Sequence, residues 1–363
     1  MAEKPGIGAS RPGSGVTLRD VAARAGVSTS TVARVVHGKG YVAEDTRDRV
    51  EAAIREGGFR LNAVASGLKS ARTMTIGTLL HETLPNPFFA EVARGIEHGA
   101  NEQDYNVLLY NARGSADRER EGVEAFLSQK VDAVVFATPL DPANVELADR
   151  AGAAVVEVEK PLYGQGGSVL VDNYAGASAA MEHLISLGHE TIGFIGEPLR
   201  EEPLEGRPVE RVVNERFGGY RDALLRHGLQ YDDSLAVLGD YALDAGWESL
   251  RTGRDYTNRL LEQQPQITAI FAGSDLLAAG ILQALYERGV RVPTQASVVG
   301  FDDTYAQHLT PPLSTVRQPM FEMGREAAAL AIELAEADSP AAREVWLSTE
   351  LIVRDSTGAP EAR

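Results

Sequence analysis

Residues 17–38 read TLRDVAARAGVSTSTVARVVHG, and this stretch predicts two short helices. Thr17 and Asp20 have the spacing of a capping box, and apolar residues then recur at helical intervals up to Gly26, which ends the first helix. Ser28 is a suitable N-cap for the second helix. Two such helices joined by a tight turn form a helix-turn-helix, whose second helix can enter the major groove of DNA. The alternative is a small helical domain with a solvated polar face.

The polar face of the second helix carries the candidate DNA contacts. Opposite its apolar side lie Thr29, Ser30, Ala33, Arg34 and His37. Hydroxyls can meet base edges, and an arginine can bind O6 and N7 of guanine. A third helix is expected over residues 44–57, without a capping oxygen at Ala43. Residues 1–15 are rich in Gly, Pro and Ser and are expected to form a disordered tail.

Charge is divided unevenly along the chain. The 363 residues carry a net charge of −17, but residues 1–75 hold 12 Lys and Arg against 7 Asp and Glu, a net of +5. The remaining residues hold 23 basic and 45 acidic side chains, a net of −22. A basic head on a large acidic body is typical of a nucleic-acid-binding module joined to a second function, although chance clustering gives the same pattern.

The body has the pattern of a parallel α/β protein. From Thr75 onward, amphipathic segments alternate with the apolar runs TIGTLL, NVLLY, VDAVVFA, AAVVEVE, TIGFIG, TAIFAG and SVVGFD. Such runs between helices indicate doubly wound parallel sheets that are covered on both faces. A stretch of about 290 residues with this pattern predicts two α/β subdomains.

Several classes of protein are disfavoured. The chain has no cysteine, and therefore neither disulfides nor a thiolate metal site. Phosphate-loop, dinucleotide, zinc-protease and serine-hydrolase motifs do not occur, so the sequence predicts no catalytic residue, no cofactor and no enzyme. His183 and His189 lie six residues apart, which does not suit a metal pair on one helix face. An apolar signal segment and an 18-residue apolar run are both missing, so a cytoplasmic protein without membrane contact is expected.

The region from Val16 to Gly77 resembles the DNA-binding region of the LacI-type family, the lactose and galactose repressors. The matching motifs are TLRDVAARAGVS, TVARVV, TRDRVEAAI and NAVASGL. The resemblance implies that Thr29, Ser30 and Arg34 read bases. It implies DNA-backbone or register contacts for Thr17, Ser28, Thr31, His37, Tyr41 and Thr46. Helix-end capping is an equal alternative for Thr31 and Thr46.

Residues 62–74 resemble the hinge helix and linker of the same family. In the family this helix folds when a dimer sits on its operator, and a leucine from each chain wedges into the central minor-groove step. Leu68 holds that position, and Asn62 and Ala65 also match the hinge motif. Gly67 weakens this helix by about 1 kcal/mol relative to alanine. An ordinary apolar linker residue is the alternative for Leu68.

Acidic residues follow several of the predicted strands, among them Glu159, Asp275 and Asp302. Because ligands of open parallel sheets bind at the carboxyl ends of the strands, these residues predict a polar ligand site. Helix N-capping is the alternative for each of them.

The body also resembles the effector-binding core of the same family, which is related to periplasmic sugar-binding proteins. The matching stretches include NPFFAEVARGIE, VVEVEKPL, ERFGGYRDAL, TAIFAGSD and VVGFDDT. The resemblance implies a ligand held between subdomains by Phe88, Phe89, Glu159, Arg216, Tyr241, Ser274 and Asp302. Arginine and carboxylate groups suit adjacent hydroxyls, and an aromatic ring suits the C–H face of a sugar. Core packing is the alternative for Phe88 and Tyr241, and a structural ion pair for Arg216 and Asp302. Glu159 stands where the family usually has Asp, and Ser274 where it usually has Asn.

These observations predict an all-α helix-turn-helix domain followed by an α/β core of two doubly wound subdomains, like a type I periplasmic binding protein. The expected parts are a tail (1–15), the DNA-binding domain (16–61), hinge and linker (62–74), the core (75–356) and a tail (357–363). Within the core, the N-subdomain takes about 75–173 and 320–347, and the C-subdomain about 174–316 and 348–356.

The predicted function is transcriptional repression controlled by a small-molecule effector, a sugar. The predicted partners are pseudo-palindromic double-stranded operator DNA, the effector and a second copy in a homodimer. A soluble sugar-binding protein of the transport type is the alternative, but such a protein would not need a helix-turn-helix.

Overall fold

The computed structural model describes residues 16–36, 40–59, 72–81, 86–196, 215–239, 247–337 and 341–361. The predicted tail at 1–15 and the predicted hinge at 62–68 lie outside these ranges. The chain divides into two compact units, Met1–Thr73 and Met74–Arg363.

The described residues of the first unit form three short helices, α1 (Leu18–Ala25), α2 (Thr29–Val36) and α3 (Glu44–Gly57). The predicted capping box starts α1: the Asp20 carboxylate accepts from the Thr17 backbone N–H at 2.8 Å, and the Thr17 hydroxyl accepts from the Asp20 N–H. One valine from each helix, Val21, Val32 and Val50, is fully buried. These valines form the centre of a small apolar core that holds the three helices together.

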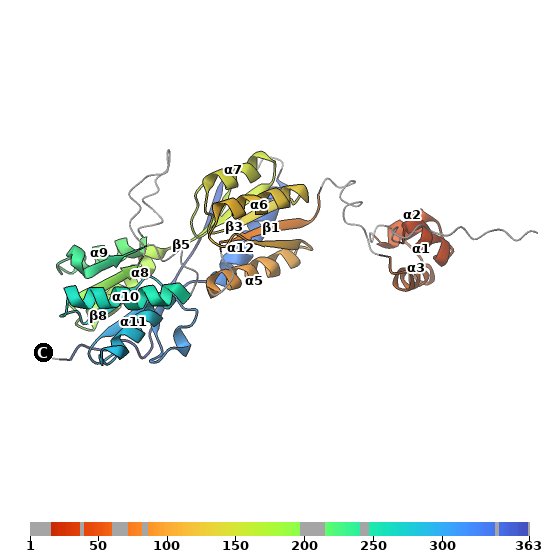
Figure 1. The fold of residues 1–363 in the computed structure, drawn as a ribbon. Helices are drawn as coiled ribbons and strands as arrows, with labels where there is room; N and C mark the ends of the chain where they lie inside the picture. The colour runs from red at the N-terminus through yellow and green to blue at the C-terminus, as the bar shows by residue number, and fades with distance from the viewer. Residues whose placement is uncertain are drawn as a thin grey trace, which may run out of the picture. The chain divides into compact units, whose positions relative to one another are not determined.

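The second unit contains two six-stranded sheets. The first has the order β11-β5-β4-β3-β1-β2, and all its strands are parallel. Its strands are β1 (Thr75–Leu80), β2 (Asn106–Asn111), β3 (Ala133–Ala137), β4 (Ala154–Val158), β5 (Gly167–Val171) and β11 (Arg343–Leu347). Helices α5 (Pro87–Asn101) and α12 (Met320–Glu336) cover one face, and α6 (Ala116–Ser128) and α7 (Pro142–Arg150) cover the other (Figure 1).

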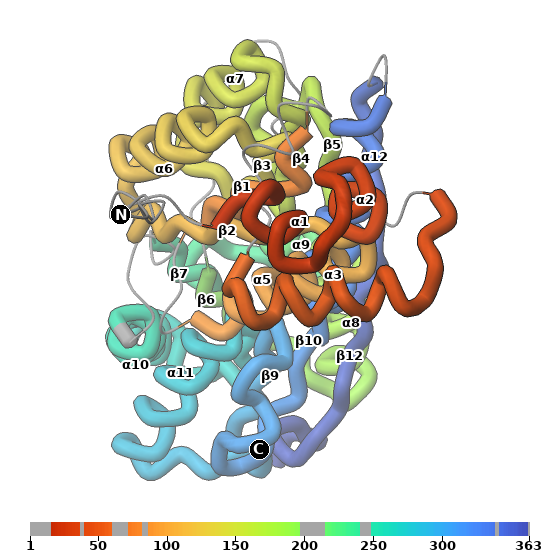
Figure 2. Tube along the Cα trace, turned by 90° about the vertical axis from the view of Figure 1, so that its right-hand side faces the viewer, coloured from red at the N-terminus to blue at the C-terminus, as the bar shows by residue number. Residues whose placement is uncertain are grey.

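The second sheet has the order β12-β10-β9-β8-β6-β7. Its strands are β6 (Ile192–Gly196), β7 (Ala236–Leu238), β8 (Ala269–Ala272), β9 (Ser297–Asp302), β10 (Ser314–Arg317) and β12 (Glu350–Ile352), of which only β12 is antiparallel to its neighbour. Helices α8 (Asn173–Ser186) and α9 (Glu215–Arg226) pack on one face, and α10 (Trp247–Gln263) and α11 (Asp275–Glu287) on the other. The last two lie against each other in both views (Figure 1 and Figure 2). Among the described residues, short 3-10 helices lie at Asp233–Leu235 and Ala306–His308.

The chain passes between the two sheets at 171–173, 317–320 and 347–350, where β5 leads to α8, β10 leads to α12, and β11 leads to β12. Each sheet therefore contains segments from distant parts of the sequence. After β12, the Gly358 N–H donates to the Ser297 hydroxyl at 3.1 Å, and the Gly358 carbonyl lies 2.9 Å from Nε2 of His189. These bonds attach the end of the chain to the second sheet.

Two parallel α/β layers with helices on both faces confirm the fold class predicted for the body. No helix among the described residues is long and apolar enough to cross a membrane.

Candidate functional site

The exposed side of α2 presents a row of hydroxyls and one arginine. Ser28, Thr29, Ser30 and Arg34 are exposed, and Thr31 is half-buried. The Ser28 hydroxyl accepts from the Thr31 backbone N–H at 3.1 Å and lies 2.8 Å from Oγ1 of Thr31. This bond caps the first turn of α2, which is the part of a recognition helix that meets base edges.

Three of the other predicted DNA contacts, Thr17, Tyr41 and Thr46, belong to the described residues of the first unit. The Tyr41 side chain is 91% exposed, so nothing within the described unit covers its ring. Thr17 serves the capping box, and the half-buried Thr46 hydroxyl lies 3.5 Å from Nη2 of Arg49. His37, Asn62, Ala65 and Leu68 lie outside the described residues.

In the second unit, Arg216 joins the carboxyl ends of strands from both sheets. Its Nη2 lies 3.4 Å from Oε1 of Glu159, which directly follows β4. Its Nη1 lies 3.7 Å from Oδ1 of Asp302, the last residue of β9. All three side chains are less than one-fifth exposed. The structure thus brings together three of the residues that the sequence predicted for the ligand site.

Three further contacts orient Arg216. Its Nε donates to Oδ1 of Asn173 at 2.9 Å, and its Nη1 donates to the Gly273 carbonyl at 2.6 Å. Its guanidinium carbon lies 3.9 Å from the centre of the Phe301 ring, a cation–π distance. One face of the guanidinium is therefore covered by protein, and its donors point to fixed places.

Glu159, like Arg216, is oriented by further hydrogen bonds. The Thr138 hydroxyl donates to its Oε2 at 2.8 Å, and its own backbone N–H donates to the Val169 carbonyl at 2.9 Å. Both Glu159 and Thr138 have positive φ angles, 71° and 59°. Positive φ is uncommon for residues other than glycine and concentrates at functional sites.

Asp302 lies at the centre of a polar cluster. Its φ is 112°, and its Oδ1 accepts from Nε2 of Gln318 at 2.7 Å. Behind it, buried Asp275 accepts from the Thr315 hydroxyl at 2.6 Å and from the Thr304 N–H at 2.7 Å. Burial, and then the neighbouring charge of Asp302, raise the pKa of Asp275 above its ordinary value.

Glu215 adds a further carboxyl beside the arginine. It lies in the first turn of α9 and bonds to Asn173. Burial, and then the charge of Asp172, raise its pKa to about 7.

The remaining predicted effector residues have contacts of their own. Phe88 and Phe89 are 4% and 7% exposed and pack edge to face, with ring centres 5.2 Å apart. His81 stacks on Phe89 at 5.8 Å. Ser274 caps α11 by accepting from the Leu277 N–H at 3.2 Å, and it is the neighbour in sequence of Gly273, which binds Arg216. Tyr241 lies outside the described residues.

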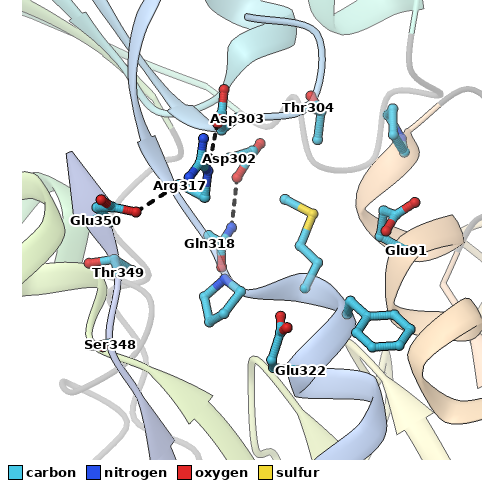
Figure 3. A pocket seen from close by; sticks show the side chains of 14 residues that line it. Glu91, Asp302, Asp303, Thr304, Arg317, Gln318, Glu322, Ser348, Thr349 and Glu350 are labelled. Atoms are coloured by element: carbon cyan, nitrogen blue, oxygen red, sulfur yellow. Dashed lines mark hydrogen bonds and ion pairs between the residues drawn. The ribbon is translucent and has the colours of Figure 1, made fainter. Parts of the chain in front are cut away.

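A cavity of about 710 Å³ opens beside Asp302 (Figure 3). Its walls come from two of the three inter-sheet passages, the end of β9 and the start of α5, and consist of 302–304, 317–322 and 348–350 together with Pro87 and Glu91. Figure 3 shows Gln318 directed at Asp302, and Arg317 between Asp303 at 2.8 Å and Glu350 at 3.4 Å. The space next to Asp302 is large enough for a small polar ligand.

Several residues of the Arg216 cluster were not predicted, among them Glu215, Thr138, Asn173 and Gln318. Thr138 and Asn173 directly follow a strand or begin a helix, so the rule that ligands bind at strand ends would have found them. Gln318 follows β10, which was not among the predicted strands. Among the described residues, no group of three or more His, Asp or Glu is placed to hold a metal ion.

Two family models match the chain. Residues 17–62 match the bacterial regulatory proteins of the lacI family, and residues 181–357 match the periplasmic binding protein-like domain. Catabolite control protein A of Priestia megaterium is 35% identical over 347 residues, covering 94% of this chain and 99% of the relative.

Two solved structures are similar over nearly their whole length. The complex of the transcriptional regulator CelR with cellobiose has a TM-score of 0.68 at 32% identity, covering 94% of this chain and 99% of that one. The lac repressor dimer bound to operator and an anti-inducer has a TM-score of 0.79 at 27% identity, covering 95% and 100%. A transport-type binding protein is disfavoured, because the match includes the helix-turn-helix. The family resemblance inferred from the sequence is confirmed, and the chain belongs to the LacI family of bacterial transcriptional regulators.

Proposed function

We propose that this regulator represses transcription as a homodimer on a pseudo-palindromic operator, and that a sugar bound between its core subdomains changes operator affinity. The proposed halves of the core are 75–173 with 320–347, and 174–316 with 348–356. One observation supports the ligand site most strongly: Arg216 contacts both Glu159 and Asp302 at the sheet edges where parallel sheets bind ligands.

The chemistry of this cluster suits a polyol. A sugar hydroxyl donates to a carboxylate and accepts from a guanidinium, so neighbouring hydroxyls can bridge Arg216 and either acid. The cavity lined by Asp302 gives a ligand space beside one of these two acids. The similar CelR structure holds cellobiose, which supports a sugar here as well.

The DNA half of the proposal rests on α2. Its exposed Thr29, Ser30 and Arg34 form a short recognition surface. A single module of this size buries only about 600–1,000 Å² on DNA, so specific binding needs two copies on two half-sites about one helical turn apart.

Coupling between ligand and operator requires an element with two arrangements. The passages between the two sheets are the candidates, because a change in the angle between the sheets alters the Arg216 bridge. A typical coupling of about 1–3 kcal/mol changes operator affinity roughly 5- to 150-fold, and operator DNA changes ligand affinity by the same factor.

The test is operator binding by fluorescence anisotropy, with and without sugar. D-ribose, D-glucose and cellobiose are first screened for a shift in melting temperature, and the sugar that shifts it is used. We expect Asp302→Ala to abolish the response while operator affinity without sugar stays near wild type. Asp117→Ala, at an exposed position on α6, is the matched control. A wild-type response in Asp302→Ala would remove Asp302 from the site, and the absence of specific operator binding by the wild type would refute the DNA half.

A further inference from the structure

Among the residues that the structure describes, the Arg216 cluster holds more carboxyl groups than guanidinium groups. Among the described residues, its guanidinium lies within ion-pair distance of Glu159 and Asp302, and the carboxyl of Glu215 is next to it. Asp275 lies close enough to Asp302 for the charge of Asp302, after burial, to raise the pKa of Asp275. A ligand that enters this cluster therefore meets a site with an excess of carboxyl groups.

The Arg216 guanidinium is already engaged. Asn173, Gly273 and Glu159 accept from three of its donors, and Phe301 covers one of its faces. A phosphate or carboxylate on a ligand could form the usual two-pronged bond with Arg216 only by displacing the Glu159 carboxylate.

Glu159 is not placed to move aside. One of its carboxylate oxygens is bonded to the Thr138 hydroxyl, while the other faces Arg216. Its backbone is fixed between β4 and β5 by the bond to Val169, in a left-handed conformation.

We infer that Glu159 makes the ligand site selective for charge: it occupies Arg216 in the free chain, admits uncharged or cationic sugars and excludes phosphorylated or carboxylated ones. This inference rests on the proposed function, because it concerns the same site. A hydroxyl can insert between the two groups by donating to Glu159 and accepting from Arg216. A phosphate there would lie within a few ångström of a fixed carboxylate, and like charges so close in a partly buried site weaken binding by about tenfold or more.

The inference is tested by titrating the full chain with D-glucose 6-phosphate and with inorganic phosphate in a calorimeter, at about 0.15 M KCl to screen nonspecific charge effects. The variants are Glu159→Gln and Glu159→Ala, which remove the charge, and Glu159→Asp, which keeps it. Glu326→Gln on α12 is the matched control, because that carboxylate sits in an exposed pair with Arg325. The basic first unit is identical in the wild type and in all variants, so any phosphate binding by that unit cancels when their anion affinities are compared.

We expect the wild type, Glu159→Asp and Glu326→Gln to bind both anions equally weakly. Glu159→Gln and Glu159→Ala should bind both anions at least about tenfold more tightly. Wild-type protein that binds glucose 6-phosphate as tightly as the neutral variants would overturn the inference. The inference would also be overturned if Glu159→Gln and Glu159→Ala both fold but bind the two anions as weakly as the wild type. The titration needs neither operator nor an uncharged sugar, so its outcome is independent of whether the sugar response proposed above exists.

Discussion

Replacing Arg216 by alanine tests whether the cluster ties the two sheets together as well as forming the ligand site. The change leaves the carboxylates of Glu159 and Asp302, 12% and 11% exposed, without their positive partner. Breaking a buried ion pair from one side typically destabilises by about 3–5 kcal/mol. The N–O distances of 3.4 and 3.7 Å are longer than those of an ideal pair, and both acids keep one other hydrogen bond. We therefore expect a loss of about 2–3 kcal/mol in the free energy of unfolding.

A second substitution, Glu159→Gln, is combined with Arg216→Ala in a double-mutant cycle, which separates the effect of charge from that of packing. Arg216→Ala lacks the guanidinium over Phe301 as well as its charge, whereas Glu159→Gln removes only the charge that is left unpaired. In the double variant the unpaired carboxylate is absent, so we expect about 1 kcal/mol of the loss to be recovered. A larger recovery would mean that the Glu159 charge accounts for most of the penalty.

The assay is urea unfolding followed by tryptophan fluorescence. The chain has two tryptophans, Trp247 and Trp346, and both belong to the second unit, so the signal does not report on the helix-turn-helix. The pairwise term follows from wild type, both single variants and the double variant. A loss below about 1 kcal/mol for Arg216→Ala, or strict additivity with Glu159→Gln, would refute a structural tie and leave Arg216 as a ligand contact alone.

Two further predictions concern the DNA face and the pH dependence of folding. Arg34→Ala should weaken operator binding by about 1–3 kcal/mol and relax the preference at one base pair of each half-site, and equal losses on specific and random DNA would instead make Arg34 a phosphate contact. The pKa of Glu215 is raised from its ordinary value of 4.5 to about 7, so the folded chain holds this proton more tightly than the unfolded chain. The free energy of unfolding should therefore fall as pH rises from about 4.5 to about 7, by about 1–2 kcal/mol more in wild type than in Glu215→Gln once solvent screening is allowed for; parallel pH profiles of the two proteins would contradict this.

The helices of the first unit and the central strands could be predicted because their signals are local. The capping box at Thr17–Asp20 and the glycine at position 26 mark the ends of α1, and the apolar runs of β1, β3 and β9 are buried on both faces. Strands β11 and β12 were not predicted. They are short and partly exposed, and they exist because β11 pairs with β5 and β12 with β10, partners that lie far away or across a helix in the sequence.

The candidate site could likewise be predicted only where its signals are local. Glu159 and Asp302 end strands that were recognised, so the rule for parallel sheets placed them at the ligand edge. Their shared contact with Arg216 depends on how two sheets meet, which a local pattern does not contain. The same limit applies to Gln318, whose bond to Asp302 depends on the register of β10 beside β9.

The long ion pairs of Arg216 suit a site whose ligand must change a conformation. A ligand shifts an equilibrium between two arrangements only by the difference in its affinity for them. If Arg216 bound Glu159 in a short two-pronged pair, a neutral hydroxyl would have to replace bonds much stronger than its own, and little differential affinity would be left. At 3.4 Å, with Thr138 sharing the carboxylate, the bond to be replaced is comparable to what a hydroxyl offers. Shortening Glu159 to aspartate weakens this contact further. On the same reasoning, that change should shift the balance between the two arrangements of the sheets and alter operator affinity in the absence of any sugar.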